Sequence, residues 1–216
     1  MLKAILWDMD GVIADSGKAH YLAWQALFAE REGQISREDF ARTFGMANPE
    51  ILRELLGPGV PDSEIADLAK RKEALFRDRI PEHVVLLPGI SEWLLWARHA
   101  GIRNVVASSG EMANIVATLS ALGISNHFDA VVSGAFLPKS KPHPAIFLQA
   151  AAAVGAPAQE SLVIEDGIVG VEAARRAGMR CIALTTTHSA ETLLGADLVV
   201  DSLVDVSEEA LRQLFS

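Results

Sequence analysis

The sequence predicts an α/β protein whose parallel sheet is flanked by helices and interrupted, after its first strand, by an all-helical segment. Short apolar runs that end in turn signals recur along the chain, and such runs are typical of strands buried on both faces. Helical patterns of about ten residues separate these runs, which indicates right-handed crossovers between parallel strands. Residues 17–79 break this alternation, because their apolar residues recur at helical spacing with charges between them.

The first predicted strand is the apolar run at residues 4–7, which ends in the turn sequence Asp8-Met9-Asp10-Gly11. Runs of the same kind follow it along the chain and end in polar or glycine residues. They lie at residues 104–107, 130–132, 161–164, 181–184 and, more weakly, 198–200. Because helices separate these runs, we expect them to form one parallel sheet.

Between the strands, apolar residues at spacings of three and four form the stripes of amphipathic helices. The clearest stripe follows the second long strand and consists of Met112, Ile115, Val116, Leu119 and Leu122. Two more helices are expected at residues 145–154 and 169–177. Gly155 and Gly178 follow them as C-terminal caps.

The inserted segment is predicted to contain four helices, at residues 18–31, 37–43, 49–56 and 62–79. A break at residues 57–61 separates the last two, and residues 81–89 form the return linker, whose Pro88-Gly89 opens the next helix. We therefore expect an α/β catalytic core at residues 1–16 and 80–216 and a helical cap domain at residues 17–79. Hinges at residues 15–17 and 81–89 suit a lid that excludes water and selects the leaving group. Extra stability or an interaction surface is the alternative role of the cap.

Composition and charge exclude several classes of protein. The 216 residues are 50% hydrophobic and 22% charged, with a formal net charge of −9. A general nucleic-acid binder needs a basic stripe and is therefore not expected. The single cysteine, Cys181, rules out a disulfide framework and a zinc site built from several thiolates. The first apolar run is too short for a signal peptide or a membrane span, so we expect a cytoplasmic protein that binds no membrane.

Polar residues follow the predicted strands at the edge where open parallel sheets bind ligands. They comprise two carboxylate pairs, a hydroxyl pair and two lysines: Asp8 and Asp10, Glu165 and Asp166, Ser108 and Ser109, Lys139 and Lys141. Carboxylates from different strands make the oxygen-lined pocket that Mg²⁺ prefers. The serine hydroxyls and the N–H groups at Ser109-Gly110 form an anion cradle. Lys141 offsets the charge of a carboxylate nucleophile and of a bound phosphate, whereas Lys139 is interpreted as a solvated loop charge.

These groups fit phosphoryl transfer through an aspartyl-phosphate intermediate. Two nearby carboxylates resist ionising together, so Asp8 and Asp10 need different roles. The metal-bound member stays ionised and attacks phosphorus, while the other gives a proton to the leaving alcohol and later takes one from water. Each motif alone has a structural explanation, such as a turn, a helix start or an N-cap. Their joint placement at four strand ends favours the functional interpretation.

Four motifs in order resemble those of the haloacid dehalogenase superfamily. They are Asp8-Met9-Asp10-Gly11-Val12, Ser108, Lys141-Pro142 and Glu165-Asp166, and the resemblance covers essentially the whole chain. It points to the branch of phosphatases and β-phosphoglucomutases with a helical cap, and so implies a Rossmann-like core of the haloacid dehalogenase type.

The resemblance also implies roles for the motif residues. Asp8 would be the nucleophile and Asp10 the general acid/base, and Asp8, Asp166 and the Asp10 carbonyl would hold Mg²⁺. Glu165 would assist the metal site. Phosphate would be bound by Ser108, and Lys141 would steady the charge.

Departures from the family pattern bear on the substrate. Gly167 stands where relatives often carry Ser or Thr, which removes one hydrogen bond near the metal. The mutase relatives carry an arginine near Asn48 that grips the distal phosphate of a bisphosphate. The residue after their second motif is basic, where this chain has Gly110-Glu111. A bisphosphate would meet less positive charge here. A phosphatase for a small phosphomonoester, such as a sugar phosphate or phosphoglycolate, is therefore favoured over a phosphosugar mutase.

Substrate contacts from the cap are expected at His20, Gly45 and Asn48. Relatives with the pattern Asp-[Ser/Thr]-x-x-x-His place this histidine near the mouth of the active site, and residues 15–20 carry the pattern. A packing or surface role for His20 is the alternative.

Two further classes of protein, signalling receivers and dehalogenases, are weighed against a phosphatase. Signalling receivers also place Asp, Ser or Thr, and Lys at strand ends, but they lack a cap, and Asp10 suits turnover rather than a stored phosphoryl group. A dehalogenase needs neither Asp10 nor the acids of a divalent metal site. The expected partner is a small phosphorylated metabolite. The sequence leaves the oligomeric state open and is compatible with a monomer.

Overall fold

The computed structural model describes residues 1–43, 46–135 and 137–215 and divides into two compact units. The first unit comprises Met1–Asp15 and Val85–Ser216, and the second comprises Ser16–Val84. A six-stranded sheet with helices on both faces makes up the first unit, and helices make up the second. The α/β class with an all-helical insertion is confirmed.

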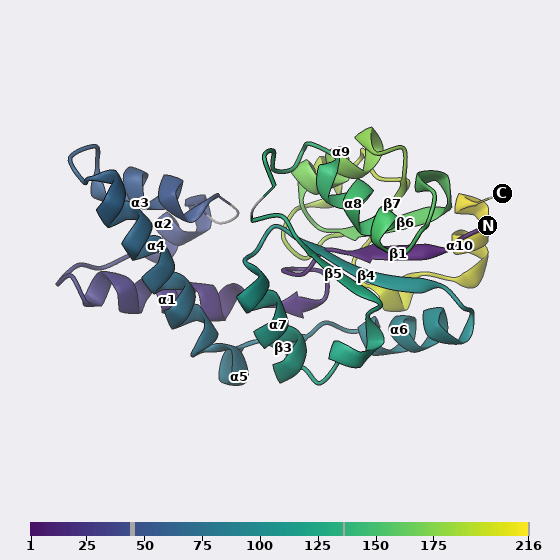
Figure 1. The fold of residues 1–216 in the computed structure, drawn as a ribbon, viewed down its shortest axis with the longest axis horizontal. Coiled ribbons are helices and arrows are strands. Elements are labelled where there is room, and N and C mark those ends of the chain that lie inside the picture. Colours follow the sequence, from purple (N-terminus) through teal and green to yellow (C-terminus); the bar gives the residue numbers. More distant parts are fainter. Residues whose placement is uncertain (44–45, 136, 216) are drawn as a thin grey trace. The chain divides into compact units, whose positions relative to one another are not determined.

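Six parallel strands form the sheet of the first unit, in the order β5-β4-β1-β6-β7-β8 (Figure 1). Their bounds are β1 Ala4–Trp7, β4 Arg103–Ser108, β5 Ala130–Ser133, β6 Ser161–Glu165, β7 Arg180–Leu184 and β8 Leu198–Val200. β1 lies between β4 and β6, and its Trp7 pairs with Val106 on one side and Ile164 on the other. This central position buries β1 on both faces, which explains why its sequence is apolar throughout.

Helices cover both faces of the sheet, with α8 and α9 on one side and α6 and α7 on the other (Figure 1). The helices of this unit are α6 Ile90–His99, α7 Met112–Ala121, α8 Ala145–Ala153, α9 Ile168–Arg176 and α10 Glu208–Leu214. Single-turn 3₁₀ helices lie at Ser125–His127, Ala158–Glu160, Ala190–Thr192 and Leu203–Asp205. Gly155 and Gly178, the predicted caps, have positive φ angles of 67° and 70° and follow α8 and α9.

Alternate residues of β1 face opposite helices, as the pleat of a strand requires. Leu6 belongs to the apolar cluster that contains residues of α8 and α9. The ring of Trp7 instead meets Trp93 of α6 edge to face, with ring centroids 6.3 Å apart, and its indole N–H donates to the side-chain oxygen of Asn104 at 3.0 Å. By this alternation Asp8 leaves the strand on the α8 side.

The second unit contains α1 Gly17–Ala29, α2 Arg37–Thr43, α3 Asn48–Leu56, α4 Asp62–Arg77 and α5 Ile80–His83. Both α1 and α3 pack against α4. Trp24, Leu27, Ile65 and Phe76 are among the buried apolar side chains of this unit. The helical spacing of these residues therefore produces a core that belongs to the insertion itself.

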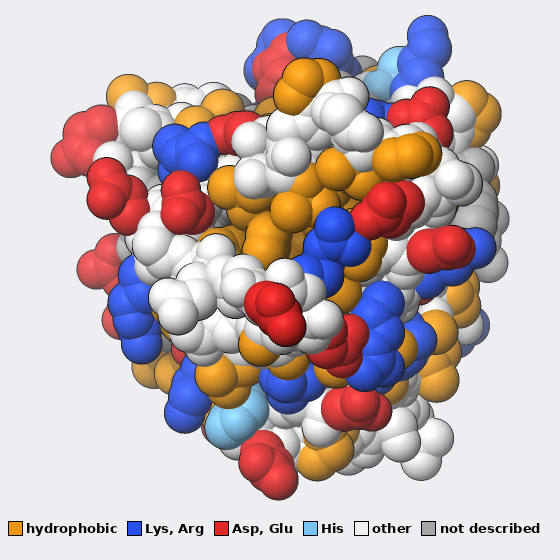
Figure 2. All heavy atoms as spheres, turned by 90° about the vertical axis from the view of Figure 1, so that its left-hand side faces the viewer, with side chains coloured by type: hydrophobic (Ala, Val, Ile, Leu, Met, Phe, Trp, Pro, Cys, Tyr) orange, Lys and Arg blue, Asp and Glu red, His pale blue; other side chains and the backbone are white. Residues whose placement is uncertain are grey.

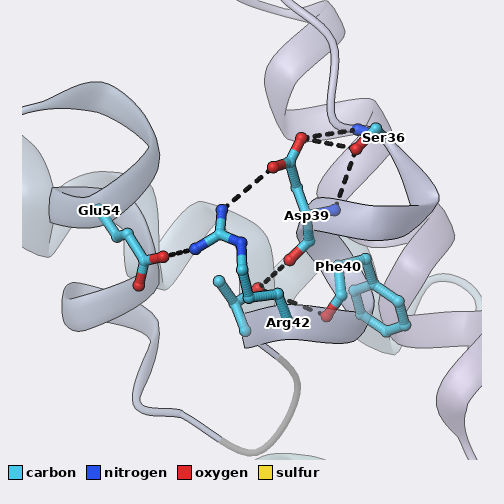
Figure 3. Close-up of polar contacts among 6 residues, drawn as sticks. Ser36, Asp39, Phe40, Arg42 and Glu54 are labelled. Atoms are coloured by element: carbon cyan, nitrogen blue, oxygen red, sulfur yellow. Dashed lines mark hydrogen bonds and ion pairs between the residues drawn. The ribbon is translucent and has the colours of Figure 1, made fainter.

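A reciprocal pair of hydrogen bonds begins α2 (Figure 3). The backbone N–H of Asp39 donates to Oγ of Ser36 at 3.0 Å, and the backbone N–H of Ser36 donates to the carboxylate of Asp39 at 3.4 Å. The Ser36 hydroxyl donates to the same carboxylate oxygen at 2.6 Å. This Ser-x-x-Asp arrangement is a capping box. Arg42 contacts the carboxylates of both Asp39 and Glu54, and so joins α2 to α3.

Part of the fold was not predicted. Residues 81–89 were expected to form the return linker, and two elements in it were not predicted: α5 extends into it and it contains strand β3, Val85–Leu86. β3 pairs antiparallel with β2, Ala14–Asp15, so the two segments that lead into the helical unit are hydrogen-bonded to each other. Strands this short carry no readable alternation pattern. The C-terminal helix α10 was also missed, and α1 and α4 end earlier than expected, because periodicity defines helix ends poorly.

Within the described ranges, no helix has both the length and the apolar character needed to cross a membrane. On the face drawn in Figure 2, acidic and basic side chains are interspersed around an apolar area.

Candidate active site

Carboxylates from two neighbouring strands meet at the carboxyl edge of the sheet. Asp8 follows β1, and its backbone N–H donates to the carbonyl oxygen of Ile164 in β6 at 3.0 Å. Glu165 is the last residue of β6, and Asp166 follows it. Asp8, Glu165 and Asp166 are all buried. The parallel register thus brings together acids that are far apart in the sequence.

Lys141 joins two of these carboxylates. Its Nζ lies 2.5 Å from Oδ1 of Asp8 and 2.6 Å from Oε1 of Glu165, and only 7% of its side chain is exposed. The same Nζ lies 4.9 Å from the ring centroid of Phe147 in α8, a favourable place for a cation. Lys139, interpreted from the sequence as a loop charge, is exposed.

Glu165 is held by donors on both of its oxygens. Oε2 accepts the backbone N–H groups of Asp166 at 2.9 Å and of Gly167 at 2.8 Å, and Oε1 accepts from Lys141. These two amides precede α9, where a negative charge is favoured by the helix dipole. Gly170 in α9 leaves the space, because a Cβ atom there would overlap the carboxyl group of Glu165. Glu165 therefore both caps α9 and orients Lys141.

The three acids form a group that fits a divalent cation. Asp8, Glu165 and Asp166 each offer one carboxylate oxygen within 4.8 Å of the others. All three donors are hard oxygens, which suits Mg²⁺ rather than a metal that prefers thiolate or imidazole. The buried site holds three carboxylates and one lysine, so a cation would offset the remaining negative charge. The carboxylate of Asp10 is not in this group, although its charge acts on Asp166.

Burial raises the pKa of two of these carboxyl groups. The pKa of Asp8 lies well above its usual value because the group is buried, with Lys141 opposing the shift and the charges of Glu165 and Asp166 adding to it. Burial and the charge of Glu165 raise the pKa of Asp166 to about 7. Burial alone would lower the pKa of Lys141, but the attraction of Asp8 and Glu165 raises it well above its ordinary value. Lys141 therefore stays charged, and the raised pKa values of Asp8 and Asp166 favour protons that a metal ion would displace.

Asp10 and Gly11 form the turn that follows β1. The backbone N–H of Gly11 donates to the carbonyl oxygen of Ala14 at 2.8 Å, and Asp10 forms an isolated bridge with Ala14. Gly11 has a φ angle of +79°, which is the left-handed conformation that glycine adopts most easily. The turn keeps Asp10 close to the strand end that carries Asp8.

Two threonines that the sequence interpretation missed also reach the site. The hydroxyl of Thr187 donates to Oδ2 of Asp166, and the hydroxyl of Thr186 donates to the carbonyl oxygen of Gly11 at 2.5 Å. Both follow β7, the neighbour of β6. The signal was present in the sequence, because three threonines come directly after the run at residues 181–184, at the same edge as the other candidates.

The predicted phosphate-binding serines lie at the end of β4, on the other side of β1 from Glu165. Ser108 is buried, and its Oγ accepts the backbone N–H of Gly110 at 3.1 Å, whereas Ser109 is exposed. The hydroxyl of Ser133 in β5 donates to the carbonyl oxygen of Gly110 at 2.6 Å. Hydrogen bonds from two strands thus fix the turn at Gly110.

The predicted substrate-contact residues belong to the helical unit. Nδ1 of His20 lies 2.9 Å from Nζ of Lys72, and Lys72 pairs with the carboxylate of Glu73 at 2.9 Å. The side-chain amide of Asn48 donates to the same Glu73 oxygen. Lys72 and Glu73 are buried and connect His20 to Asn48, which the sequence did not reveal. Gly45 lies outside the described residues.

Comparisons with known proteins give matches along most of the chain. A model of the haloacid dehalogenase-like hydrolase family matches residues 2–178. Protein SUPPRESSOR OF QUENCHING 1, chloroplastic, from Arabidopsis thaliana is 34% identical over 95% of this chain, which spans only 20% of that protein. Phosphoglycolate phosphatase from Nitrosococcus oceani is 29% identical, over 94% of this chain and 93% of its own length. The crystal structure of β-phosphoglucomutase from Clostridium difficile superposes on this chain with a TM-score of 0.85 and a sequence identity of 28%. The match covers 100% of this chain and 97% of that one.

Proposed function

Because this chain belongs to the haloacid dehalogenase-like hydrolases, we propose that it is a Mg²⁺-dependent phosphatase of a small phosphomonoester. The family expected from the four motifs is confirmed, and relatives named as phosphatases support a hydrolase of phosphoric monoesters. The observation that carries the proposal is the buried contact of Lys141 with both Asp8 and Glu165. The contact with Glu165 fixes the ammonium group of Lys141 beside the carboxylate of Asp8. A positive charge at this place allows an anionic nucleophile to approach an anionic phosphate.

The proposed reaction uses Asp8 as the nucleophile. An oxygen of its ionised carboxylate bonds to phosphorus while the bond from phosphorus to the ester oxygen breaks, which leaves an acyl phosphate on Asp8. Protonated Asp10 gives its proton to the departing alkoxide, so the alcohol leaves neutral. Asp10 then takes a proton from a water molecule whose oxygen attacks phosphorus. The bond from phosphorus to Asp8 breaks, inorganic phosphate is released, and both aspartates return to their starting states.

Mg²⁺ would be held by Asp8, Glu165 and Asp166, with the carbonyl oxygen of Asp10 as the family resemblance implies. When bound, it would neutralise part of the charge on the phosphoryl oxygens and keep Asp8 ionised. The raised pKa of Asp8 without a metal supports this dependence, because a protonated carboxyl group is a poor nucleophile.

Lys141 and the two serines are proposed to bind the transferring phosphoryl group. Lys141 stays charged and contributes a donor beside Asp8 throughout the reaction. Ser108 supplies a hydroxyl at the neighbouring strand end, where its Oγ also accepts the backbone N–H of Gly110. Ser109 is exposed and would reach phosphate from the same turn.

A phosphosugar mutase is the second candidate, and the resemblance to β-phosphoglucomutase supports it. One observation favours the phosphatase. Asn48, near the position of the mutase arginine, is uncharged and donates to Glu73, and Glu73 also pairs with Lys72. These residues supply less net positive charge for a second phosphate than an arginine would. We therefore propose a monophosphate substrate of the sugar phosphate or phosphoglycolate type.

A hydrolysis screen tests this proposal. Wild-type protein is assayed on a panel of phosphomonoesters with Mg²⁺ and with a chelator. The panel includes phosphoglycolate and glucose 1-phosphate, the latter with and without its bisphosphate. We expect release of inorganic phosphate only with Mg²⁺, and a loss of about 10³-fold or more in Asp8→Asn, as is found when a nucleophile is removed. Asp205→Asn, an exposed change in the same unit, should leave the rate unchanged.

Other outcomes would reject the phosphatase. Full metal-dependent turnover by Asp8→Asn would exclude Asp8 as the nucleophile. Isomerised sugar phosphate with little inorganic phosphate would identify a mutase. An acyl phosphate that persists for minutes after a pulse of phosphodonor would favour a switch module.

A further inference from the structure

The carboxylate of Asp166 is held by a residue from another strand. Asp166 lies in the turn between β6 and α9 and is only 6% exposed. The hydroxyl of Thr187, in the loop that follows β7, donates to its Oδ2. β6 and β7 are paired neighbours, with Glu165 opposite Ala183. The sheet register therefore brings the Thr187 loop beside the Asp166 turn.

The backbone of Gly11 closes the other side of this contact. A Cβ atom on Gly11 would overlap the Asp166 carboxylate and come within 2.9 Å of Oγ1 of Thr187. The neighbouring Thr186 donates to the carbonyl oxygen of Gly11 at 2.5 Å. The loop after β7 is thus hydrogen-bonded to the first turn through Thr186 and to the acid through Thr187, so the two hydroxyls have separate partners.

The residue after Asp166 contributes no side-chain donor, because position 167 is glycine. The N–H groups of Asp166 and Gly167 are both taken by Glu165. The hydroxyl that orients the Asp166 carboxylate therefore comes from Thr187 rather than from the adjoining residue. Groups that hydrogen-bond a metal-ligating carboxylate fix its orientation and commonly change metal affinity when they are removed.

We propose that Thr187 is a positioning residue that orients Asp166 for the metal ion. This inference rests on the proposed function, because it takes Asp166 to be a metal ligand. Thr187 is itself exposed, so the loss of its hydroxyl removes little from the core. Its main effect should fall on metal binding.

Calorimetric titration with Mg²⁺ alone tests the inference without substrate. The proteins compared are wild type, Thr187→Val, Thr187→Ser and Thr186→Val. Thr187→Val keeps the shape of the side chain and removes the hydroxyl, and we expect it to bind Mg²⁺ about 10- to 100-fold more weakly. Thr187→Ser restores the donor and should bind close to wild type. Thr186→Val is the matched control, an exposed threonine whose hydroxyl meets Gly11 instead of the acid, and it should also bind close to wild type.

The possible results separate this inference from the proposed function. Equal affinity for wild type and Thr187→Val would overturn the inference and leave the phosphatase intact. A loss of the same size in Thr187→Ser or in Thr186→Val would also overturn it, because the effect would then belong to the loop and not to the hydroxyl. If wild type itself binds no Mg²⁺, both the metal site and the inference are wrong. Thermal unfolding of each metal-free variant is compared with wild type, to establish that every variant is folded at the temperature of the titration.

Discussion

Gly170 lies so close to Glu165 that no Cβ atom fits between the first turn of α9 and the carboxyl group. The same carboxylate accepts two backbone amides before α9 and the ammonium group of Lys141. A side chain at position 170 must therefore displace either the helix or the acid. The absence of a side chain at position 170 thus determines where Glu165, and with it the ammonium group of Lys141, can lie.

Gly170→Ala is expected to lower both stability and activity. The methyl group would push Glu165 from the amides that precede α9, and overpacking of this kind costs about 1–3 kcal/mol in the free energy of unfolding. We expect phosphatase activity to fall at least about 10-fold, as it does when a group that positions catalytic residues shifts. Urea unfolding and the hydrolysis assay measure the two effects. Gly59→Ala is the control, because a Cβ there meets nothing within 4 Å. Equal unfolding midpoints for the two variants would contradict this account.

Lys141→Gln is expected to destabilise the metal-free protein strongly at pH 8. The change leaves Asp8 and Glu165 without their cation, and breaking a buried ion pair in this way costs about 3–5 kcal/mol. The loss of unfolding free energy should be smaller at pH 5 than at pH 8, because Asp8 takes up a proton more readily at the lower pH. Lys139→Gln removes the same charge from an exposed position and should change the free energy of unfolding by less than about 0.5 kcal/mol. Thermal denaturation of both variants in chelator at the two pH values checks the expectation, which fails if their melting temperatures agree.

The metal-free protein should lose stability as the pH rises from about 4 to 7, since the folded state keeps a proton on Asp166 that the unfolded state releases. The pKa of this group is about 7 when folded, against an ordinary value of 3.8. Over that window the folded state binds more protons, so the free energy of unfolding falls with pH. Asp8, whose pKa is also raised, acts in the same direction. Mg²⁺ should raise the melting temperature more at pH 8 than at pH 6, because fewer protons must then be displaced.

Urea unfolding in chelator at a series of pH values measures this dependence. Asp166→Asn cannot titrate and should show a shallower decline than wild type. An identical decline in the two proteins would mean that other groups cause the dependence.

Ser36→Ala is expected to destabilise α2 in the helical unit. It removes the hydroxyl that accepts from Asp39 and donates to its carboxylate (Figure 3), and the loss of an N-cap costs about 1 kcal/mol. Arg42→Gln removes exposed contacts with Asp39 and Glu54, and exposed ion pairs of this kind contribute about 0–1 kcal/mol. Hydrogen exchange of the α2 amides should therefore accelerate more in Ser36→Ala. Faster exchange in Arg42→Gln would reverse this ranking.

Much of the fold follows from patterns that are local in the sequence. The apolar run of β1 and the stripe that begins at Met112 each indicate an element and the surface it buries, because side-chain direction repeats with the period of the backbone. Gly155 and Gly178 mark helix ends for a similarly local reason, the positive φ angle that a cap requires. The rule that parallel strands present their carboxyl ends at one edge then places Asp8 beside Glu165.

The sequence by itself therefore determined the α/β class, the helical insertion and the set of polar residues that share one edge of the sheet. The tertiary structure decided which of those groups touch. The contact of Thr187 with Asp166, the space that Gly170 leaves for Glu165 and the link from Asn48 to Lys72 through Glu73 have no periodic signature. Such contacts depend on strand register and helix packing to within an ångström, and these are set by the whole core and not by any one segment.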